Sequence, residues 1–211
     1  MENKNMKKIL TRGALAAALA LSLASCGGGK ATFTIGGLVQ GLKYGPVVLT
    51  TNGQDKTVMP KSTNGEDVTY SFDKQLEYGD EYLVTVKTQP PHQTCSGMTL
   101  PETAGRLSSI TVLVGCVDTP HTIGGSVTGL TKGTLVLANG STAGTRAIAS
   151  TDTTNGTLAA YTLPNTATWN QTYGVTVLTQ PEGLTCTVAN GTGVMGDENV
   201  TNVNVTCVPN P

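Results

Sequence analysis

The chain has 211 residues and a formal net charge of −1, with 13% charged and 4% aromatic residues. Beyond its first 25 residues it contains no cluster of Lys or Arg, which excludes the basic surface of a nucleic-acid-binding protein. It also lacks a polybasic segment for anionic lipid. Attachment to a membrane must therefore depend on another feature of the chain.

The first 25 residues predict a cleaved signal peptide. The apolar run at 13–23 is shorter than the ~20 residues needed to span a bilayer, and it fits the apolar region of a secretory signal. The segment from Met6 would be a complete signal by itself, so Met1 and Met6 both stay open as the start. The positive charges before the run are Lys4, Lys7, Lys8 and Arg12.

A Leu-Ala-Ser-Cys sequence that ends at Cys26 resembles the lipobox of bacterial lipoproteins. In that family the cysteine is acylated on its sulfur, the chain is cut before it, and the new amino group is acylated. The resemblance implies that residues 1–25 are removed and that residues 26–32 form a lipidated, Gly-rich tether. Several acyl chains on Cys26, at ~0.8 kcal/mol per buried methylene, would anchor the chain stably in a membrane. The alternative is an ordinary cleaved signal followed by a free thiol.

The residue after the cysteine bears on localisation. In the family's sorting rule an Asp at this position favours retention in the inner membrane, and this chain has Gly27 instead. The resemblance therefore implies a location in the bacterial cell envelope with a lipid anchor in the outer membrane. Whether the surface or the periplasmic face carries the protein stays open.

Apolar and polar residues alternate in short runs after the tether, as they do for example at 82–88. Alternation with Val, Ile and Thr, interrupted by Gly, Asn and Pro, is the signature of β-strands. No stretch supports an amphipathic helix of ten residues. Evenly spaced strands in a short unit predict an antiparallel β-sandwich. The expected strands of the first unit lie near 33–39, 46–51, 56–59, 68–73, 82–88, 93–97 and 109–116.

The chain contains an internal repeat. Residues 82–95 read YLVTVKTQPPHQTC, and residues 173–186 read YGVTVLTQPEGLTC, 91 positions later. A second match relates 34–42 to 122–130, at an offset of 88. A repeat of this length is a whole domain rather than a solenoid unit. We expect one domain at 33–117, a short joint at 118–121 and a second domain at 122–208.

Four cysteines remain after Cys26, and each domain holds two of them at the same spacing. Four thiols allow three pairings, but the repeat favours one pair within each domain. Such pairs are expected to be oxidised in an exported protein. Two thiols per domain do not supply the four ligands of a structural zinc site, so we expect neither metal nor cofactor. The predicted disulfides are Cys95–Cys116 and Cys186–Cys207.

The repeated pattern Ile-x-Gly-x-Val-x-Gly-Leu, followed by Tyr-x-Val-x-Val and Thr-Gln-Pro-x-x-x-Thr-Cys, resembles prealbumin-like modules of bacterial surface proteins, among them carboxypeptidase regulatory-like domains. The resemblance covers almost all of 33–208. It implies two tandem Ig-like or prealbumin-like β-sandwiches that act as structural or interaction modules. That family has no set of catalytic residues to transfer.

Few residues qualify as a candidate site. His92 and His121 lie in a loop and in the joint, and neither belongs to a motif that would orient it for catalysis. Tyr78 and Trp169 stand at matching turns of the two domains. Exposed turn aromatics bind sugar faces or anchor interfaces; the alternative is an aromatic lid over the open end of each sandwich.

The sequence thus predicts a non-enzymatic, lipid-anchored envelope protein that acts in surface display, adhesion or scaffolding. Its partners would be the membrane, through Cys26, and a protein or glycan at the surface. One alternative is a glycan-binding module that uses Tyr78 and Trp169. The other is an accessory subunit of an envelope enzyme.

Overall fold

The computed structural model describes residues 31–105, 109–140 and 144–211. The predicted signal peptide, Cys26 and most of the tether lie outside the described residues. In these ranges strands form nearly all of the regular structure, and the single helical element is a short 3-10 turn, η1 (Ser150–Asp152). Within the described ranges no helix is long and apolar enough to cross a membrane. The fold class is all-β, as predicted.

The first half of the chain forms a sandwich of two sheets, here called the N-terminal sandwich. The expected strands are all present, although the run expected at 82–88 is divided into β7 and β8. One sheet has the order β5-β2-β11-β9 and comprises Val68–Ser71, Ile35–Gln40, Ile110–Asp118 and Gln93–Ser96. The other has the order β4-β3-β8 and comprises Gln54–Val58, Val47–Thr51 and Thr85–Thr88. Two short pairs complete it: β1 (Thr32–Phe33) with β6 (Leu76–Glu77), and β7 (Glu81–Tyr82) with β10 (Glu102–Thr103).

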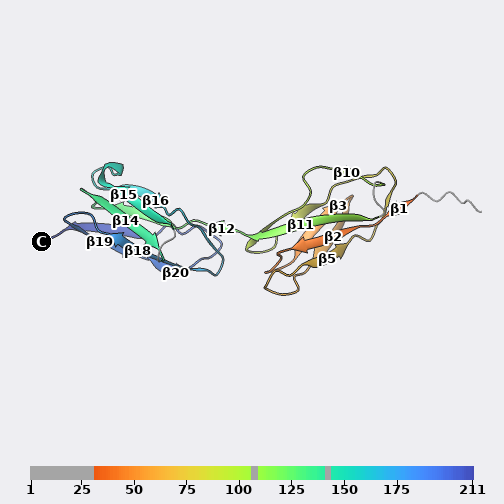
Figure 1. The fold of residues 1–211 in the computed structure, drawn as a ribbon, viewed down its shortest axis with the longest axis horizontal. Coiled ribbons are helices and arrows are strands. Elements are labelled where there is room, and N and C mark those ends of the chain that lie inside the picture. Colours follow the sequence, from red (N-terminus) through yellow and green to blue (C-terminus); the bar gives the residue numbers. More distant parts are fainter. Residues whose placement is uncertain (1–30, 106–108, 141–143) are drawn as a thin grey trace, which may run out of the picture.

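The C-terminal sandwich repeats this topology, and Figure 1 shows the two sandwiches following one another along the long axis. Its first sheet, in the order β16-β13-β21-β19, comprises Leu158–Thr162, Gly124–Thr128, Asn204–Pro209 and Leu184–Ala189. Its second, in the order β15-β14-β18-β20, comprises Thr145–Ala149, Thr134–Asn139, Thr172–Thr179 and Thr192–Val194. The pair β12 (Pro120–His121) with β17 (Ala167–Thr168) corresponds to β1 with β6.

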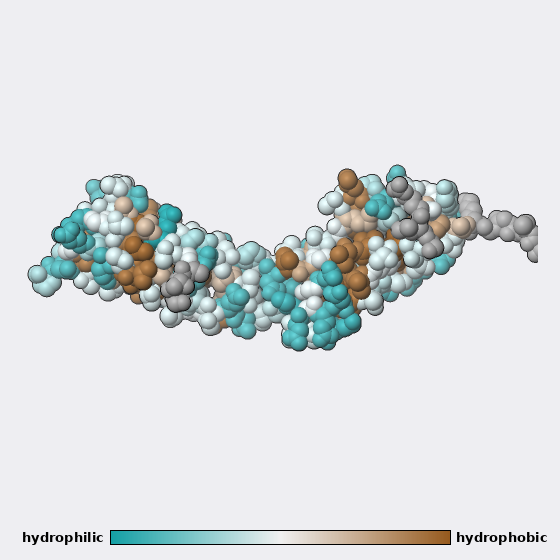
Figure 2. All heavy atoms as spheres, in the orientation of Figure 1, coloured by the Kyte–Doolittle hydropathy of each residue, from teal (hydrophilic) through white to brown (hydrophobic). Residues whose placement is uncertain are grey.

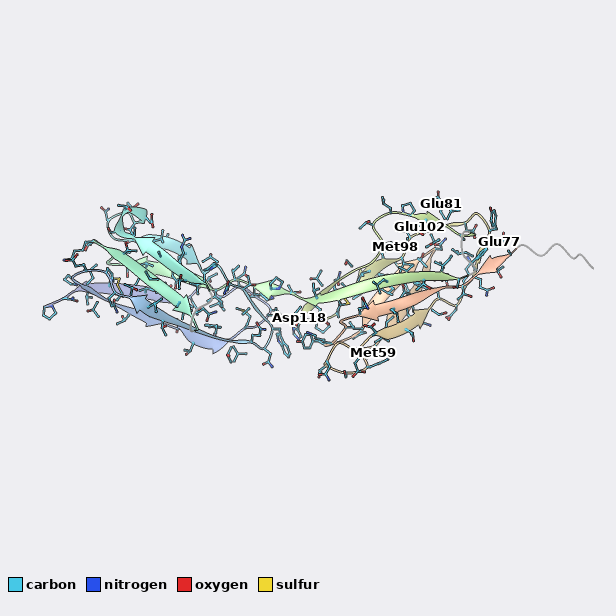
Figure 3. All side chains as sticks on the ribbon, viewed as in Figure 1. Met59, Glu77, Glu81, Met98, Glu102 and Asp118 are labelled. Carbon is cyan, nitrogen blue, oxygen red and sulfur yellow. A yellow bond between two sulfur atoms is a disulfide. The ribbon has the colours of Figure 1, made fainter. Side chains whose placement is uncertain are left out.

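One strand pair in each sandwich departs from the antiparallel arrangement expected from the sequence. Strand β2 pairs parallel with β11, and β13 pairs parallel with β21. These are the first and last long strands of each sandwich, so the chain enters at one end and leaves at the opposite end. We call these ends the N-terminal and C-terminal poles. Figure 3 shows Glu77 and Asp118 at opposite poles of the N-terminal sandwich.

Each sandwich has its own hydrophobic core. The inward residues of β11 (Ile110, Val112, Val114 and Cys116) alternate with exposed ones, as the period of two predicts. The two clusters of buried residues share no member. In Figure 2 the visible surface is mainly neutral to hydrophilic, with separate apolar areas on both sandwiches.

Both cores contain a buried tyrosine at the same position. Tyr70 Oη donates a hydrogen bond to the Val112 carbonyl oxygen at 3.1 Å, and Tyr161 Oη donates to that of Val203 at 2.8 Å. A buried hydroxyl needs such a partner because its desolvation would otherwise cost free energy. Burial raises the pKa of Tyr70 and of Tyr161 to about 12.

The structure contains both disulfides that the cysteine spacing predicts. Cys95 lies directly opposite Cys116 in the β9–β11 pair, and Cys186 lies opposite Cys207 in the β19–β21 pair. Each bond therefore joins neighbouring strands of one sheet and does not bridge the two sheets. It fixes an edge strand to the last strand of its sandwich.

The repeated Gln of the Thr-Gln-Pro motif completes this edge. Gln180 Nε2 donates to the Cys186 carbonyl oxygen at 3.0 Å, and its Oε1 accepts from the Cys186 backbone N–H at 2.8 Å. Gln89 makes the same two bonds to Cys95 at 2.9 and 2.7 Å. The side-chain amide thus occupies the place of a neighbouring strand. This satisfies backbone groups that would otherwise be unpaired, which explains why both copies carry the residue.

Removing one disulfide should destabilise one sandwich. For Cys186→Ser with Cys207→Ser we expect the free energy of unfolding of the C-terminal sandwich to fall by about 3 kcal/mol, the value for a loop of this length in the chain-entropy model. Hydrogen exchange followed by mass spectrometry reports each sandwich separately. Protection in the N-terminal sandwich should stay unchanged because the cores are separate, and a comparable loss there would contradict this.

Alkaline pH should unfold the protein through its buried tyrosines. In the unfolded chain a phenol ionises near pH ~10, whereas the pKa of Tyr70, Tyr82 and Tyr161 is raised to about 12. Their contribution to stability is therefore present below pH ~10 and is lost as the pH rises through about 12. Phenolate absorbance and circular dichroism should change together over this range. Tyr161→Phe should make the C-terminal sandwich less sensitive to alkali.

Candidate functional site at the junction of the sandwiches

The joint between the sandwiches is very short. Strand β11 ends at Asp118 and β12 begins at Pro120, so Thr119 alone lies between a strand of one sandwich and a strand of the next. Thr119 donates its backbone N–H to the His92 carbonyl oxygen at 3.0 Å, and its hydroxyl lies 3.1 Å from that of Thr94. The joint is thus bonded to the N-terminal sandwich through both the backbone and the side chain of Thr119.

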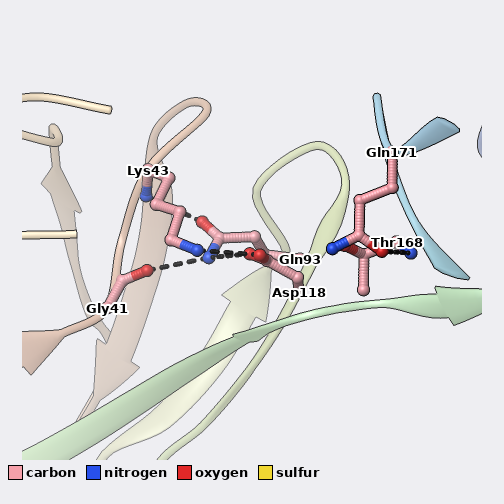
Figure 4. Close-up of polar contacts among 6 residues, drawn as sticks. All are labelled: Gly41, Lys43, Gln93, Asp118, Thr168 and Gln171. Carbon is pink, nitrogen blue, oxygen red and sulfur yellow. Dashed lines mark hydrogen bonds and ion pairs between the residues drawn. The ribbon is translucent and has the colours of Figure 1, made fainter. Parts of the chain in front are cut away.

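A polar network fixes the start of the joint (Figure 4). Lys43 Nζ donates to Asp118 Oδ2 at 2.7 Å, and Gln93 Nε2 donates to Asp118 Oδ1 at 3.0 Å. The same Gln93 amide donates to the Gly41 carbonyl oxygen and accepts from the Lys43 backbone N–H. The hydrogen bond to Asp118 raises the pKa of Lys43, so the ammonium group stays charged near neutral pH. We call Lys43, Gln93 and Asp118 the joint network.

Three aromatic rings from the two sandwiches meet beside this network. The Trp169 ring stacks on the His92 imidazole, with centroids 4.0 Å apart and planes 10° from parallel. Tyr44 contacts both rings edge-on, at 5.4 Å from His92 and 5.1 Å from Trp169. Tyr44 and His92 belong to the C-terminal pole of the first sandwich, and Trp169 belongs to the N-terminal pole of the second.

A contact between the imidazole and a carboxylate accompanies the stacked rings. His92 Nδ1 lies 2.5 Å from Asp197 Oδ1, and the two side chains are 19% and 57% exposed. Asp197 belongs to the loop between β20 and β21, so this contact also crosses from one sandwich to the other. We call Tyr44, His92, Trp169 and Asp197 the junction cluster.

The turn that carries Trp169 is held by its own hydrogen bonds. Gln171 Oε1 accepts from the Thr168 backbone N–H at 2.9 Å, as Figure 4 shows, and the Asn170 N–H donates to the Met195 carbonyl oxygen at 2.9 Å. These bonds hold the backbone of the turn on either side of Trp169. The second sandwich therefore holds the turn whose Trp169 ring stacks on His92.

The backbone of His92 indicates that its side chain is needed. Its φ is +61°, in the left-handed region, and the matching residue of the second sandwich is Gly183 with φ +66°. Left-handed backbone costs a non-glycine residue roughly 1 kcal/mol or more, and such outliers persist where surrounding contacts or function hold them. The imidazole contacts with Trp169 and Asp197 supply that reason.

The residues at the C-terminal pole of the first sandwich differ from those at the matching positions of the second. Its five contact residues in the first sandwich are Lys43, Tyr44, His92, Gln93 and Asp118. The matching residues of the second sandwich are Thr131, Lys132, Gly183, Leu184 and Pro209, which cannot make the same network. The copies thus diverge at the pole that, in the first sandwich, contacts the second one.

The two turn aromatics have different surroundings in spite of their matching positions. Trp169 is partly covered by the preceding sandwich. Tyr78 is 72% exposed, and its ring lies against Gly105 at the N-terminal pole of the first sandwich. Trp169 thus contacts residues of the preceding sandwich, which is the arrangement of an interface anchor rather than of a sugar-binding ring or a lid over its own sandwich. The sequence analysis placed His92 in a loop and did not predict its contact with Trp169. The available signal was that the matching residue of the second sandwich is Gly183.

Other hollows of the described surface offer little chemistry. A cavity of about 230 Å³ beside β13 and β16 is lined by Thr122, Gly124, Gly125, Tyr161, Val200 and uncharged neighbours. A more open one of about 350 Å³ is lined by Lys56 and Asp73 with residues of β5. No group of three potential metal ligands occurs among the described residues.

Truncating Trp169 should loosen the junction without unfolding either sandwich. With Trp169→Ala the stacking on His92 is lost, and the two sandwiches should reorient independently. Residual dipolar couplings measured by NMR would then require two alignment tensors where the unmodified chain requires one. Tyr78→Ala, at the matching turn, is the control and should keep a single tensor. A single tensor in Trp169→Ala would show that the indole does not hold the junction.

No protein-family model and no curated protein matches the chain, so the likeness to carboxypeptidase regulatory-like modules stays a prediction. Among solved structures it is similar to the shaft pilin of Lactobacillus rhamnosus GG, with 11% identity, a TM-score of 0.30, and coverage of 85% of this chain and 99% of that one. A single B repeat unit of the collagen-binding surface protein of Staphylococcus aureus is 21% identical, with a TM-score of 0.26 and coverage of 84% of this chain and 100% of that one. A streptococcal ancillary pilin is 14% identical, with a TM-score of 0.25 and coverage of 84% of this chain and 63% of that one.

Proposed function

We propose that this chain is a non-enzymatic, lipid-anchored protein of the bacterial cell envelope, in which two sandwiches form a spacer that displays or positions a binding partner. The observation that carries the proposal is the junction. The stacked rings and the His92–Asp197 pair make contacts across it, and the joint network fixes the end of β11, from which the joint leaves the first sandwich. A linker without them would let the sandwiches move independently.

The anchor position sets which sandwich lies farther from the membrane. Four residues lie between Cys26 and Ala31, the first described residue, and the five residue-to-residue steps span only about 17 Å even when fully extended. An acylated Cys26 would therefore keep the N-terminal pole close to the lipid surface. Because each sandwich has its entry and exit at opposite poles, the C-terminal sandwich would be held outward.

The surroundings of the turn aromatics favour this role over glycan binding. A sugar-binding platform needs an accessible ring face, and one face of Trp169 is covered by His92. Tyr78 stays accessible, but it is separated from Trp169 by the length of the first sandwich. The two aromatics therefore do not form one binding site. The described cavities add no observation that favours an accessory enzyme subunit.

Acylation of Cys26 is the first point to test. We expect the unmodified chain in the membrane fraction, with a mass increase of several acyl chains on an N-terminal Cys26 peptide. Cys26→Ala should appear in the soluble fraction with both sandwiches folded. Recovery of unmodified chain as a soluble protein with a free thiol would contradict the anchor.

Protease treatment of intact cells would then locate the sandwiches. Digestion without permeabilisation supports display and adhesion at the surface. Digestion only after the outer membrane has been permeabilised supports a periplasmic scaffold and excludes adhesion.

A further inference from the structure

We propose that the junction is proton-dependent: protonated His92 holds the two sandwiches in one fixed orientation through Asp197 and Trp169, and loss of the proton loosens them. The inference concerns the regulation of the junction. It rests on the proposed function only for its setting, an envelope site that is exposed to the external pH.

The geometry provides two interactions that strengthen when the imidazole gains a positive charge. The first is the contact of His92 Nδ1 with the Asp197 carboxylate at 2.5 Å, which becomes an ion pair. The second is the parallel stacking on Trp169 at 4.0 Å, in which a cation lies over the face of the indole. A neutral imidazole can still donate one hydrogen bond to Asp197, so deprotonation weakens the junction without abolishing it.

The other groups around His92 do not compete for this role. From the β2–β3 loop, Tyr44 contacts the imidazole edge-on, and the neighbouring Lys43 is bonded to Asp118. From the β20–β21 loop, Glu198 follows Asp197 in the sequence and is a second carboxylate of that loop. From the joint, Thr119 contacts only the His92 carbonyl oxygen. The carboxylate of Asp197 is thus the charged group in contact with the ring.

The residue type matches a proton-dependent role. Histidine is the side chain whose ordinary charge change falls between about pH 5 and pH 8. Glycine would satisfy the left-handed backbone at this position without strain, as Gly183 does at the matching position of the second sandwich. The strained position therefore carries the one side chain that can stack, form an ion pair and change its charge near neutral pH.

The size of the effect follows from the exposure of the pair. Because Asp197 is more than half exposed, solvent and salt screen the attraction. We expect the ratio of fixed to loosened junction to fall about three- to fivefold between about pH 5.5 and pH 8, which is the change for an exposed pair worth less than ~1 kcal/mol.

The test uses the full mature chain carrying Cys26→Ser, so that its outcome does not depend on acylation. Trp169 is the only tryptophan, and its fluorescence, which a protonated imidazole quenches, reports the contact directly. We expect the fluorescence to rise from about pH 5.5 to pH 8. The inter-sandwich order from residual dipolar couplings should fall over the same range, in a single titration that matches the NMR titration of His92.

Matched variants separate this mechanism from a general effect of pH. His92→Gly copies the second sandwich, and His92→Asn keeps a residue that tolerates the left-handed backbone; both should give a loose junction with no pH response. Asp197→Asn should reduce the response, and His121→Gln, which removes the other histidine, should keep it. An inter-sandwich order that is constant with pH in the parent chain, or a response that persists in both His92 variants, would overturn the proposal.

Discussion

The parallel pairing of the first and last long strands in each sandwich is the constraint on which the rest of the structure depends. Because β2 and β11 run in the same direction, the chain leaves the first sandwich at the pole opposite its entry. The second sandwich repeats the arrangement with β13 and β21. Two such units joined by a single residue must follow one another end to end, whereas antiparallel terminal strands would return the chain to its starting pole.

This arrangement explains where the copies agree and where they differ. The features that build one sandwich occur in both copies: the buried Tyr70 and Tyr161, the disulfides, and the Gln amide bonded to the cysteine backbone. The features that join one sandwich to the next occur once. His92, for example, has the strained backbone that Gly183 adopts without strain. Duplication supplied two equal units, and divergence at the facing poles made the junction between them.

The sequence was sufficient for the features that repeat locally. Alternating residues located the strands, and equal spacing paired Cys95 with Cys116 and Cys186 with Cys207. It was insufficient for strand direction, because a period of two is the same in parallel and antiparallel strands. It also left the junction unseen, since Tyr44, His92, Trp169 and Asp197 are far apart in the chain and meet only once both sandwiches are folded. The sequence signal that pointed there was the set of replacements at this pole between the copies, among them His92 by Gly183.

The C-terminal pole of the second sandwich lacks the groups that make the joint network. The position that matches Asp118 holds Pro209, which has neither a carboxylate nor a backbone N–H. Leu184, in the place of Gln93, cannot bridge the loops by hydrogen bonds. Two copies with the same topology therefore do not carry the same junction chemistry. The strands and disulfides that the copies share build a sandwich, whereas the residues that differ at this pole decide which contacts it can make with a neighbouring domain.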